Sequence, residues 1–131
     1  MGNITDIDVR AITALLVAHH KATATKNVPL LERVFAPGGL FVGTDDSEVW
    51  SFERLRDALA GTKSGWDMTH CSLRRIDGIS GHADIANFFE VLMHTKYGRM
   101  RGSGTVSKIS GKWRIIHYVL SFSISNEIVD T

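Results

Sequence analysis

The chain contains one cysteine and two prolines among 131 residues, and it carries almost no excess charge. Because Cys71 is the single cysteine, an internal disulfide is excluded. The net charge is +1 and no basic run occurs, which argues against a surface for nucleic acid or anionic membrane. No apolar run approaches the roughly 18 residues of a membrane-spanning helix, and the N-terminus lacks a signal-peptide pattern. We therefore expect a cytoplasmic protein that binds neither nucleic acid nor membrane.

Metal and cofactor motifs are also missing from the sequence. His19 and His20 are adjacent, but adjacent helical residues point about 100° apart and do not share an ion without a further ligand. No His-x-x-x-His motif, cysteine pair or carboxylate cluster occurs at metal-binding spacing. The glycine-rich stretch 101–104 lies inside a predicted strand, with no helix after it to bind phosphate. We expect no metal and no cofactor.

The N-terminal half has helical patterning. Hydrophobic residues make up 44% of the chain, which is enough for one domain across residues 1–131. Thr5 and Asp8 form a capping-box pattern before a stretch whose apolar residues recur at helical spacing, with His19 in the buried stripe. Asn27 and Ser51 are suitable caps for two further helices. The expected helices are residues 6–26, a short helix after Asn27, and residues 52–59.

The C-terminal half switches to a period of two, which is typical of strands. Short turns with glycine predict antiparallel hairpins between the long strands. Gly102 and Gly104 fall inside one strand, where glycine marks a bend or a close backbone approach. A sheet bent in this way is able to wrap around helices, so the predicted class is α+β. The expected strands are residues 40–44, 66–76, 82–94, 99–109 and 112–123.

A set of short motifs in a fixed order supports a family resemblance. The motifs are Phe35-Ala36-Pro37, Phe41-Val42-Gly43-Thr44-Asp45, Glu48-Val49-Trp50, Phe89-Glu90-Val91-Leu92, Lys96-Tyr97-Gly98, Arg101-Gly102-Ser103-Gly104, Gly111-Lys112-Trp113-Arg114-Ile115, His117-Tyr118 and Leu120-Ser121. Together they resemble the SnoaL-like family of the nuclear-transport-factor-2-like (NTF2-like, ketosteroid isomerase-like) superfamily, over about residues 7–126. The resemblance implies a cone-shaped fold with N-terminal helices packed in a strongly curved antiparallel sheet. It also implies a homodimer and a deep apolar pocket.

Three charged or polar residues stand near the middles of successive predicted strands. Glu90, Arg101 and His117 have apolar neighbours that suggest burial, and buried charges need partners. We expect the three side chains to meet across the sheet as an acid–base site. Phe88 shares the strand face of Glu90, and Ser103 shares that of Arg101. The alternative is a structural ion pair with a hydrogen-bonded histidine that stabilises the sheet.

Asp45 is a second candidate acid or base. It follows the first short strand, close to where the resemblance implies the proton-abstracting aspartate of ketosteroid isomerases. Aligning residues 35–37 puts Gly43 at that position, with Asp45 two residues later on the same face. The alternative is an aspartate that caps a turn beside Asp46.

Aromatic residues are the candidates for the substrate pocket. We expect Trp50, Trp66 and Tyr97 at the pocket mouth or wall, with Phe88 and Ser103 completing it. Core packing or a dimer contact is the alternative for the aromatic residues.

The function expected from these features is a cofactor-independent acid–base enzyme, of the isomerase, cyclase, dehydratase or hydrolase type. It would act on a small apolar organic molecule, with Glu90 or Asp45 as acid or base and Arg101 and His117 orienting the carboxylate or polarising the substrate. Because the superfamily also includes proteins that only bind ligands or other proteins, two alternatives stay open. These are a non-catalytic small-ligand-binding domain and a dimeric interaction domain of the same fold.

Overall fold

Helices and short strands alternate in the first half of the chain, and four long strands follow. A computed structural model describes residues 2–66 and 70–129. In chain order the elements are α1 (Asp6–Thr25), α2 (Val28–Val34), β1 (Phe35–Val42), β2 (Val49–Ser51), α3 (Phe52–Gly61), β3 (His70–Ile79), β4 (His82–His94), β5 (Gly98–Ile109), β6 (Lys112–Phe122) and α4 (Asn126–Val129).

The helices begin at the caps that the sequence predicts. The Thr5 hydroxyl accepts a hydrogen bond from the Asp8 backbone N–H (3.2 Å), and the Asp8 carboxylate accepts one from the Thr5 N–H (2.9 Å). This reciprocal pair is a capping box. Asn27 caps α2 through the Leu30 N–H, and Ser51 caps α3.

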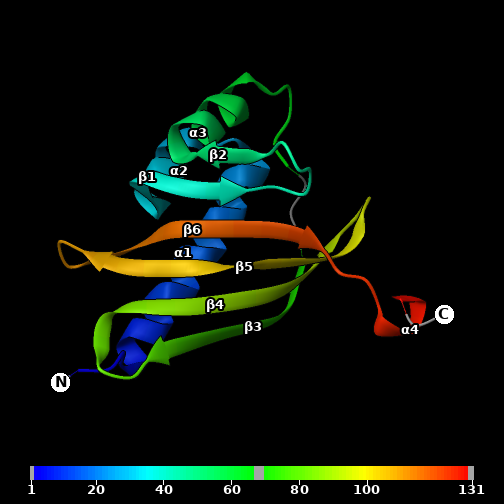
Figure 1. The fold of residues 1–131 in the computed structure, drawn as a ribbon. Coiled ribbons are helices and arrows are strands. Elements are labelled where there is room, and N and C mark those ends of the chain that lie inside the picture. The colour runs from blue at the N-terminus through cyan, green and yellow to red at the C-terminus, as the bar shows by residue number, and fades with distance from the viewer. Residues whose placement is uncertain (1, 67–69, 130–131) are drawn as a thin grey trace.

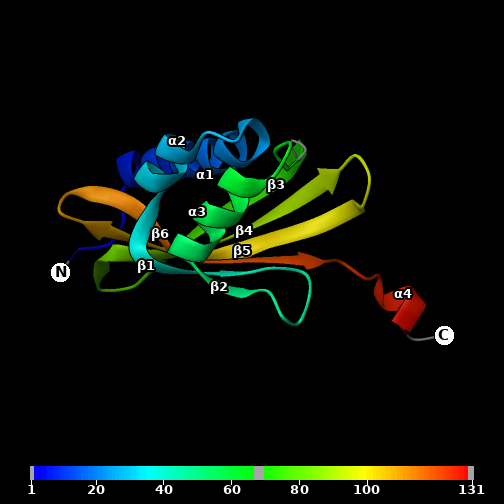
Figure 2. The same cartoon turned by 90° about the horizontal axis from the view of Figure 1, so that it is seen from above.

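One face of a curved sheet carries the helices. The strand order is β2-β1-β6-β5-β4-β3, with β1 parallel to β6 and the other neighbours antiparallel. Figure 1 shows α1 crossing behind the long strands, and Figure 2 shows α1, α2 and α3 on the same side of the sheet. The predicted α+β class is confirmed. No helix within residues 2–66 and 70–129 has the length and apolar character needed to cross a membrane.

The core lies between α1 and the covered face of the sheet. On α1, Ile12, Leu16 and His19 are buried at helical spacing, as the sequence predicts. They face apolar side chains from the strands, such as Phe88 and Ile115. Burial of this stripe fixes α1 over the sheet, and its last turns then project His19 and His20 towards the centre of the molecule.

Two strand boundaries differ from the expectation. The strand expected over residues 40–44 begins earlier, because α2 ends at Val34 and β1 runs over Phe35–Val42. Pro37, Gly38 and Gly39 are accommodated inside β1 because its pairing with β6 is irregular between Phe35 and Leu40. Strand β3 begins at His70 and not at Trp66, and residues 67–69 of the predicted strand lie outside the described residues.

A β-bulge interrupts the pairing of β5 with β6. Thr105 pairs with His117, whereas Val106 pairs with Ile115, so Ile116 is the extra residue. Gly104 lies beside this bulge, and a side-chain Cβ there would fall 1.9 Å from the His117 carbonyl oxygen. The glycine in the strand therefore permits the close backbone approach that the sequence predicts.

Candidate functional site

A cavity of about 340 Å³ lies between the C-terminal half of α1, α3 and the covered face of the sheet. Its apolar wall includes Phe41, Trp50, Leu55, Leu59, Leu92 and Leu120. A volume of this size lies at the lower end of the range for small-molecule sites. The geometry thus offers a largely apolar space for one small molecule.

Exposure separates the mouth of the cavity from its floor. Thr44, Ser64 and Trp66 line it and are exposed, so they mark the opening. His19 and Tyr118 line it and are 4% and 1% exposed, so they mark the floor. Polar groups at the floor are the ones that a bound molecule would meet away from bulk water.

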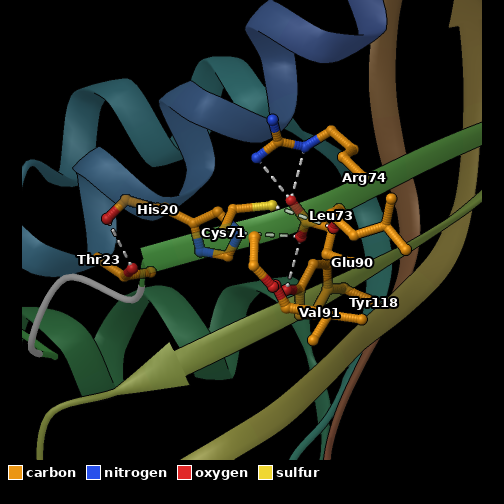
Figure 3. A network of polar contacts seen from close by, with 9 residues as sticks. His20, Thr23, Cys71, Leu73, Arg74, Glu90, Val91 and Tyr118 are labelled. Carbon is orange, nitrogen blue, oxygen red and sulfur yellow. Dashed lines mark hydrogen bonds and ion pairs between the residues drawn. The ribbon is translucent and has the colours of Figure 1, made fainter.

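Glu90 of β4 is fully buried beside this floor and is surrounded by donors (Figure 3). Its Oε1 atom accepts hydrogen bonds from His20 Nε2 (2.9 Å) and from the Tyr118 hydroxyl (3.2 Å). Its Oε2 atom lies 2.8 Å from both Nε and Nη2 of Arg74, the residue opposite Glu90 on β3. Each carboxylate oxygen therefore has two donors, and the buried charge is paired.

Gly102 makes room for part of this network. It lies opposite Glu90 on β5, and a Cβ at this position would lie 2.1 Å from the Tyr118 hydroxyl oxygen. The missing side chain lets Tyr118 reach across β5 to the carboxylate. The sequence feature that predicts a close approach at Gly102 thus serves the polar network directly.

The network keeps Glu90 ionised. Burial raises the pKa of the Glu90 carboxyl, but the hydrogen bonds from His20 and Arg74 and the positive charge of Arg74 lower it by a larger amount, so the pKa lies below its usual range. Burial and the charge of Glu90 raise the pKa of Tyr118 well above its usual range. Tyr118 therefore remains a protonated hydrogen-bond donor to a negative carboxylate.

His20 connects the buried carboxylate to the cavity. It lines the cavity, and its Nε2 atom is the ring nitrogen that contacts Glu90. Since an ionised carboxylate only accepts hydrogen bonds, Nε2 carries a hydrogen. Among the described residues, Nδ1 of His20 has no hydrogen-bond partner. In the neutral ring this atom is an acceptor and a potential base.

The predicted meeting of Glu90 with Arg101 and His117 is wrong. Arg101 pairs with Val91, the neighbour of Glu90, so it points to the opposite face of the sheet and is exposed. The β-bulge at Ile116 reverses the alternation along β6, which turns Tyr118 inward and His117 outward. Arg74 and Tyr118 occupy the places that the sequence analysis assigned to Arg101 and His117.

Asp45 lies in an exposed turn away from this network. Its Oδ1 atom accepts hydrogen bonds from the Ser47 hydroxyl (2.7 Å) and the Ser47 backbone N–H (2.8 Å). These bonds lower the pKa of the Asp45 carboxyl. The arrangement is the turn-capping alternative, and Glu48 of the same turn lines the cavity instead.

The predicted pocket residues fall into two groups. Trp50 and Trp66 line the cavity. Tyr97 stacks on Trp66 with ring centroids 5.7 Å apart, just outside the lining, and Phe88 packs against Tyr118 in the core. Ser103 pairs with Phe89 and lies on the uncovered face of the sheet.

Within residues 2–66 and 70–129, no three His, Cys, Asp or Glu side chains come together as a metal site would require. The ring centroids of His19 and His20 lie 5.1 Å apart, but the nearest carboxylate, Glu90, is already held by its own donors. The polar side chains at the cavity floor are groups that form hydrogen bonds.

Comparison with known proteins supports the same architecture. A family model described as a SnoaL-like domain matches residues 12–125. A search of curated proteins gives no match. Several solved structures have the same fold at low sequence identity.

Three of these structures illustrate the range. A protein of unknown function from the DUF3225 family of Pectobacterium atrosepticum has a TM-score of 0.76 at 19% identity, covering 93% of this chain and 95% of that one. An NTF2-like protein of unknown function from Shewanella baltica has a TM-score of 0.72 at 17% identity, covering 92% and 98%. An NTF2-like protein of unknown function from Silicibacter pomeroyi is 26% identical with a TM-score of 0.61, covering 86% and 92%. Because the family model covers most of the chain, the protein belongs to the SnoaL-like domain family, with an NTF2-like fold.

Proposed function

We propose that this domain is a cofactor-independent acid–base enzyme acting on a small, largely apolar organic molecule, with His20 as the residue that moves the proton. The observation that carries the proposal is the 2.9 Å hydrogen bond between His20 Nε2 and the buried Glu90 carboxylate beside the cavity. A histidine held in this way has a fixed tautomer and a free second nitrogen. Histidine is the side chain used most often for general acid–base catalysis.

Glu90 is a positioning residue in this proposal. The carboxylate fixes the imidazole orientation and stabilises the imidazolium that forms when Nδ1 takes a proton. Arg74 and Tyr118 hold the carboxylate in turn, with the contacts to Oε2 and Oε1 described above. The catalytic role assigned to Glu90 from the sequence thus passes to His20, which lines the cavity.

The reaction class that fits this geometry is proton transfer next to a carbonyl or hydroxyl group. The Nδ1 atom of His20 would accept a proton from the substrate carbon next to that group. Return of that proton to a different atom gives an isomerisation, and its transfer to a neighbouring hydroxyl, which then leaves as water, gives a dehydration. The apolar wall would keep water away and strengthen the electrostatic contacts during transfer.

A hydrogen–deuterium exchange experiment tests the proposal. Cyclic ketones such as 1-decalone and 1-tetralone are incubated with the protein in D₂O, and loss of the α-proton signal is followed by NMR. We expect catalysed exchange with at least one ketone. His20→Gln should lower the rate by about 10²- to 10⁴-fold, the usual contribution of a general base.

His117→Gln is the matched control because it removes a histidine from the uncovered face of the same sheet. It should leave the exchange rate unchanged. Equal losses in the two variants, or no exchange with ketones that bind, would contradict the catalytic proposal.

Ligand binding without catalysis is the second candidate. It is favoured by the full pairing of Glu90, whose four short contacts also suit a structural role. In that case the ketones shift the NMR signals of cavity residues, and the ketones themselves take up no deuterium. The same experiment therefore separates the two candidates.

We also propose that two copies pair through the sheet face that the helices leave uncovered. The family resemblance implies a homodimer, and Leu73 and Met93 on that face are 52% and 42% exposed. Exposed apolar side chains of this kind are typical of association surfaces.

A further inference from the structure

His19 is a polar side chain at the cavity floor that the proton-transfer proposal does not use. It is 4% exposed, lines the cavity and is one of the buried residues of α1. Its ring lies 4.5 Å from the Tyr118 ring and 5.5 Å from the Phe35 ring, centroid to centroid. An apolar residue would fill this place without the cost of burying a polar ring, so the identity of His19 needs a physical reason.

The two ring nitrogens of His19 differ in their surroundings. Nδ1 is buried and has no hydrogen-bond partner among the described residues. Nε2 also has no such partner, but it is not fully enclosed, and the residue lines the cavity. An N–H group buried without an acceptor is costly and rare. The favourable tautomer therefore has its hydrogen on Nε2, the nitrogen that a ligand can reach.

His19 remains neutral in this environment. Burial lowers the pKa of His19 well below its usual range. The adjacent His20 donates through Nε2 to Glu90 and keeps Nδ1 as an acceptor. The floor thus offers one donor from His19 and one acceptor from His20. Their ring centroids lie 5.1 Å apart and both residues line the cavity, so the two rings are close enough for one small ligand to contact both.

We propose that His19 and His20 together select a neutral, largely apolar ligand that carries one hydroxyl or carbonyl oxygen at the cavity floor. A hydroxyl oxygen would accept a hydrogen bond from His19 Nε2 and donate its own hydrogen to His20 Nδ1. A ketone oxygen would accept from His19 only, leaving His20 Nδ1 for the adjacent C–H. This inference rests on the proposed function in taking the same cavity as the site, and it adds a specificity-determining residue and a ligand class.

Anionic ligands do not fit this floor. No lysine or arginine is among the described residues that line the cavity. Arg74 is paired with Glu90, and the Arg54 guanidinium lies over the ring of Trp50 in the cavity wall, 5.2 Å from the ring centroid. Glu48 adds an acidic side chain to the wall. A carboxylate or phosphate at the floor would therefore have no unpaired cationic partner there, at a high desolvation cost.

Three naphthalene compounds of similar size test the proposal: 2-naphthol, naphthalene and 2-naphthoate. Dissociation constants are measured by NMR titration at pH 7.5. We expect 2-naphthol to bind about 10-fold more tightly than naphthalene, the gain that one or two hydrogen bonds supply, and more tightly than 2-naphthoate. His19→Phe should lower this preference to less than about 3-fold while naphthalene still binds, which shows that the cavity is intact. His19→Gln retains an N–H donor and should recover part of the preference, and His117→Phe should keep all of it.

Binding of 2-naphthoate as the tightest ligand, an unchanged preference in His19→Phe, or binding of none of the three would overturn the inference. The outcome is separable from that of the catalytic proposal. If His19→Phe loses the preference but the unmodified protein exchanges no ketone protons, the ligand class stands and proton transfer falls. If exchange occurs and the preference does not depend on His19, proton transfer stands and this inference falls.

Discussion

Glu90 remains charged inside the molecule because its two oxygens share four donor contacts from α1, β3 and β6. A paired buried charge adds little net stability, but removing one partner leaves the other charge buried and unpaired in an apolar interior. At the residue scale, the consequence of a substitution therefore depends on which side of the sheet the residue faces.

Arg74 and Arg101 are a matched pair for this point. Arg74→Gln should lower the free energy of unfolding by about 3 kcal/mol, because Glu90 would lose its guanidinium while staying buried. Arg101→Gln, on the uncovered face, should change it by less than about 0.5 kcal/mol. Urea unfolding followed by circular dichroism at pH 7 measures both. The double variant Arg74→Gln with Glu90→Gln should recover much of the loss, and equal losses in the two single variants would contradict the expectation.

His19 should make stability depend on pH. Its folded-state pKa lies well below 6.5, so the unfolded chain binds more protons than the folded one as the pH falls below that value. The stabilisation is thus present above pH 6.5 and is lost as the pH falls, by up to about 1.4 kcal/mol per pH unit for one proton. The corresponding loss from Glu90 begins only below about pH 4.5, so it does not overlap.

The check is a comparison of unfolding free energies at pH 7.5 and pH 5.0. The unmodified protein should lose about 2 kcal/mol more over this interval than His19→Phe does. His117→Phe, a variant on the uncovered face, should keep the full pH dependence. A pH dependence that persists in His19→Phe would show that His19 is not held neutral by the fold.

At the scale of the element, β5 determines which side chains can meet Glu90. Gly102→Ala would bring a Cβ to 2.1 Å from the Tyr118 hydroxyl and 3.1 Å from Glu90 Oε1. We expect a loss of about 2 kcal/mol from overpacking and from the broken Tyr118–Glu90 hydrogen bond. In a Tyr118→Phe background the same change should cost less, because the closest atom is gone. Gly61→Ala at the end of α3 is the control, because a Cβ there meets no atom within 4 Å, and this change should be neutral or stabilising. Equal losses of stability from Gly102→Ala in the two backgrounds would contradict the expectation.

The elements also show what the sequence could predict and what it could not. Caps, helix stripes and the extent of β4 follow from local patterns, so Thr5, Asn27 and Ser51 are found at the helix starts as expected. The face of the sheet to which a side chain points depends on the pairing between strands. One inserted residue at Ile116 reverses that face for the rest of β6. Alternation alone therefore placed His117 inside and left Tyr118 out of the site.

Arg74 was missed for a related reason. Its pairing with Glu90 depends on the β3–β4 hairpin, whose register shifts between Gly78 and Ile79 and again between Cys71 and Leu73. Counting back from the turn does not reproduce that register. His20 was missed because it lies beside the buried stripe of α1, which includes His19, and its contact with Glu90 depends on how α1 packs on the sheet.

At the scale of the whole molecule, the two faces of the sheet differ in which side chains they carry and in how exposed these are. The covered face carries the cavity together with Glu90 and Tyr118, which are hydrogen-bonded to each other across two strands, and Glu90 is also bonded to His20 of α1. The uncovered face of the long strands carries exposed side chains such as Leu73 and Arg101. If two copies pair through the uncovered face as proposed, substitutions there should alter association without altering the cavity.

Leu73→Lys tests this division. If the uncovered face pairs two copies, a lysine there would bury a charge in the contact, and the dimer should dissociate at least 10-fold more readily. Sedimentation equilibrium measures the mass, and ketone binding by NMR should remain unchanged because Leu73 lies on the opposite face from Glu90. Ile7→Lys is the control, since Ile7 is 71% exposed on α1 and belongs to the helical side of the sheet. A protein that is monomeric at all concentrations, or one whose mass responds to Ile7→Lys and not to Leu73→Lys, would show that the uncovered face is not the pairing surface.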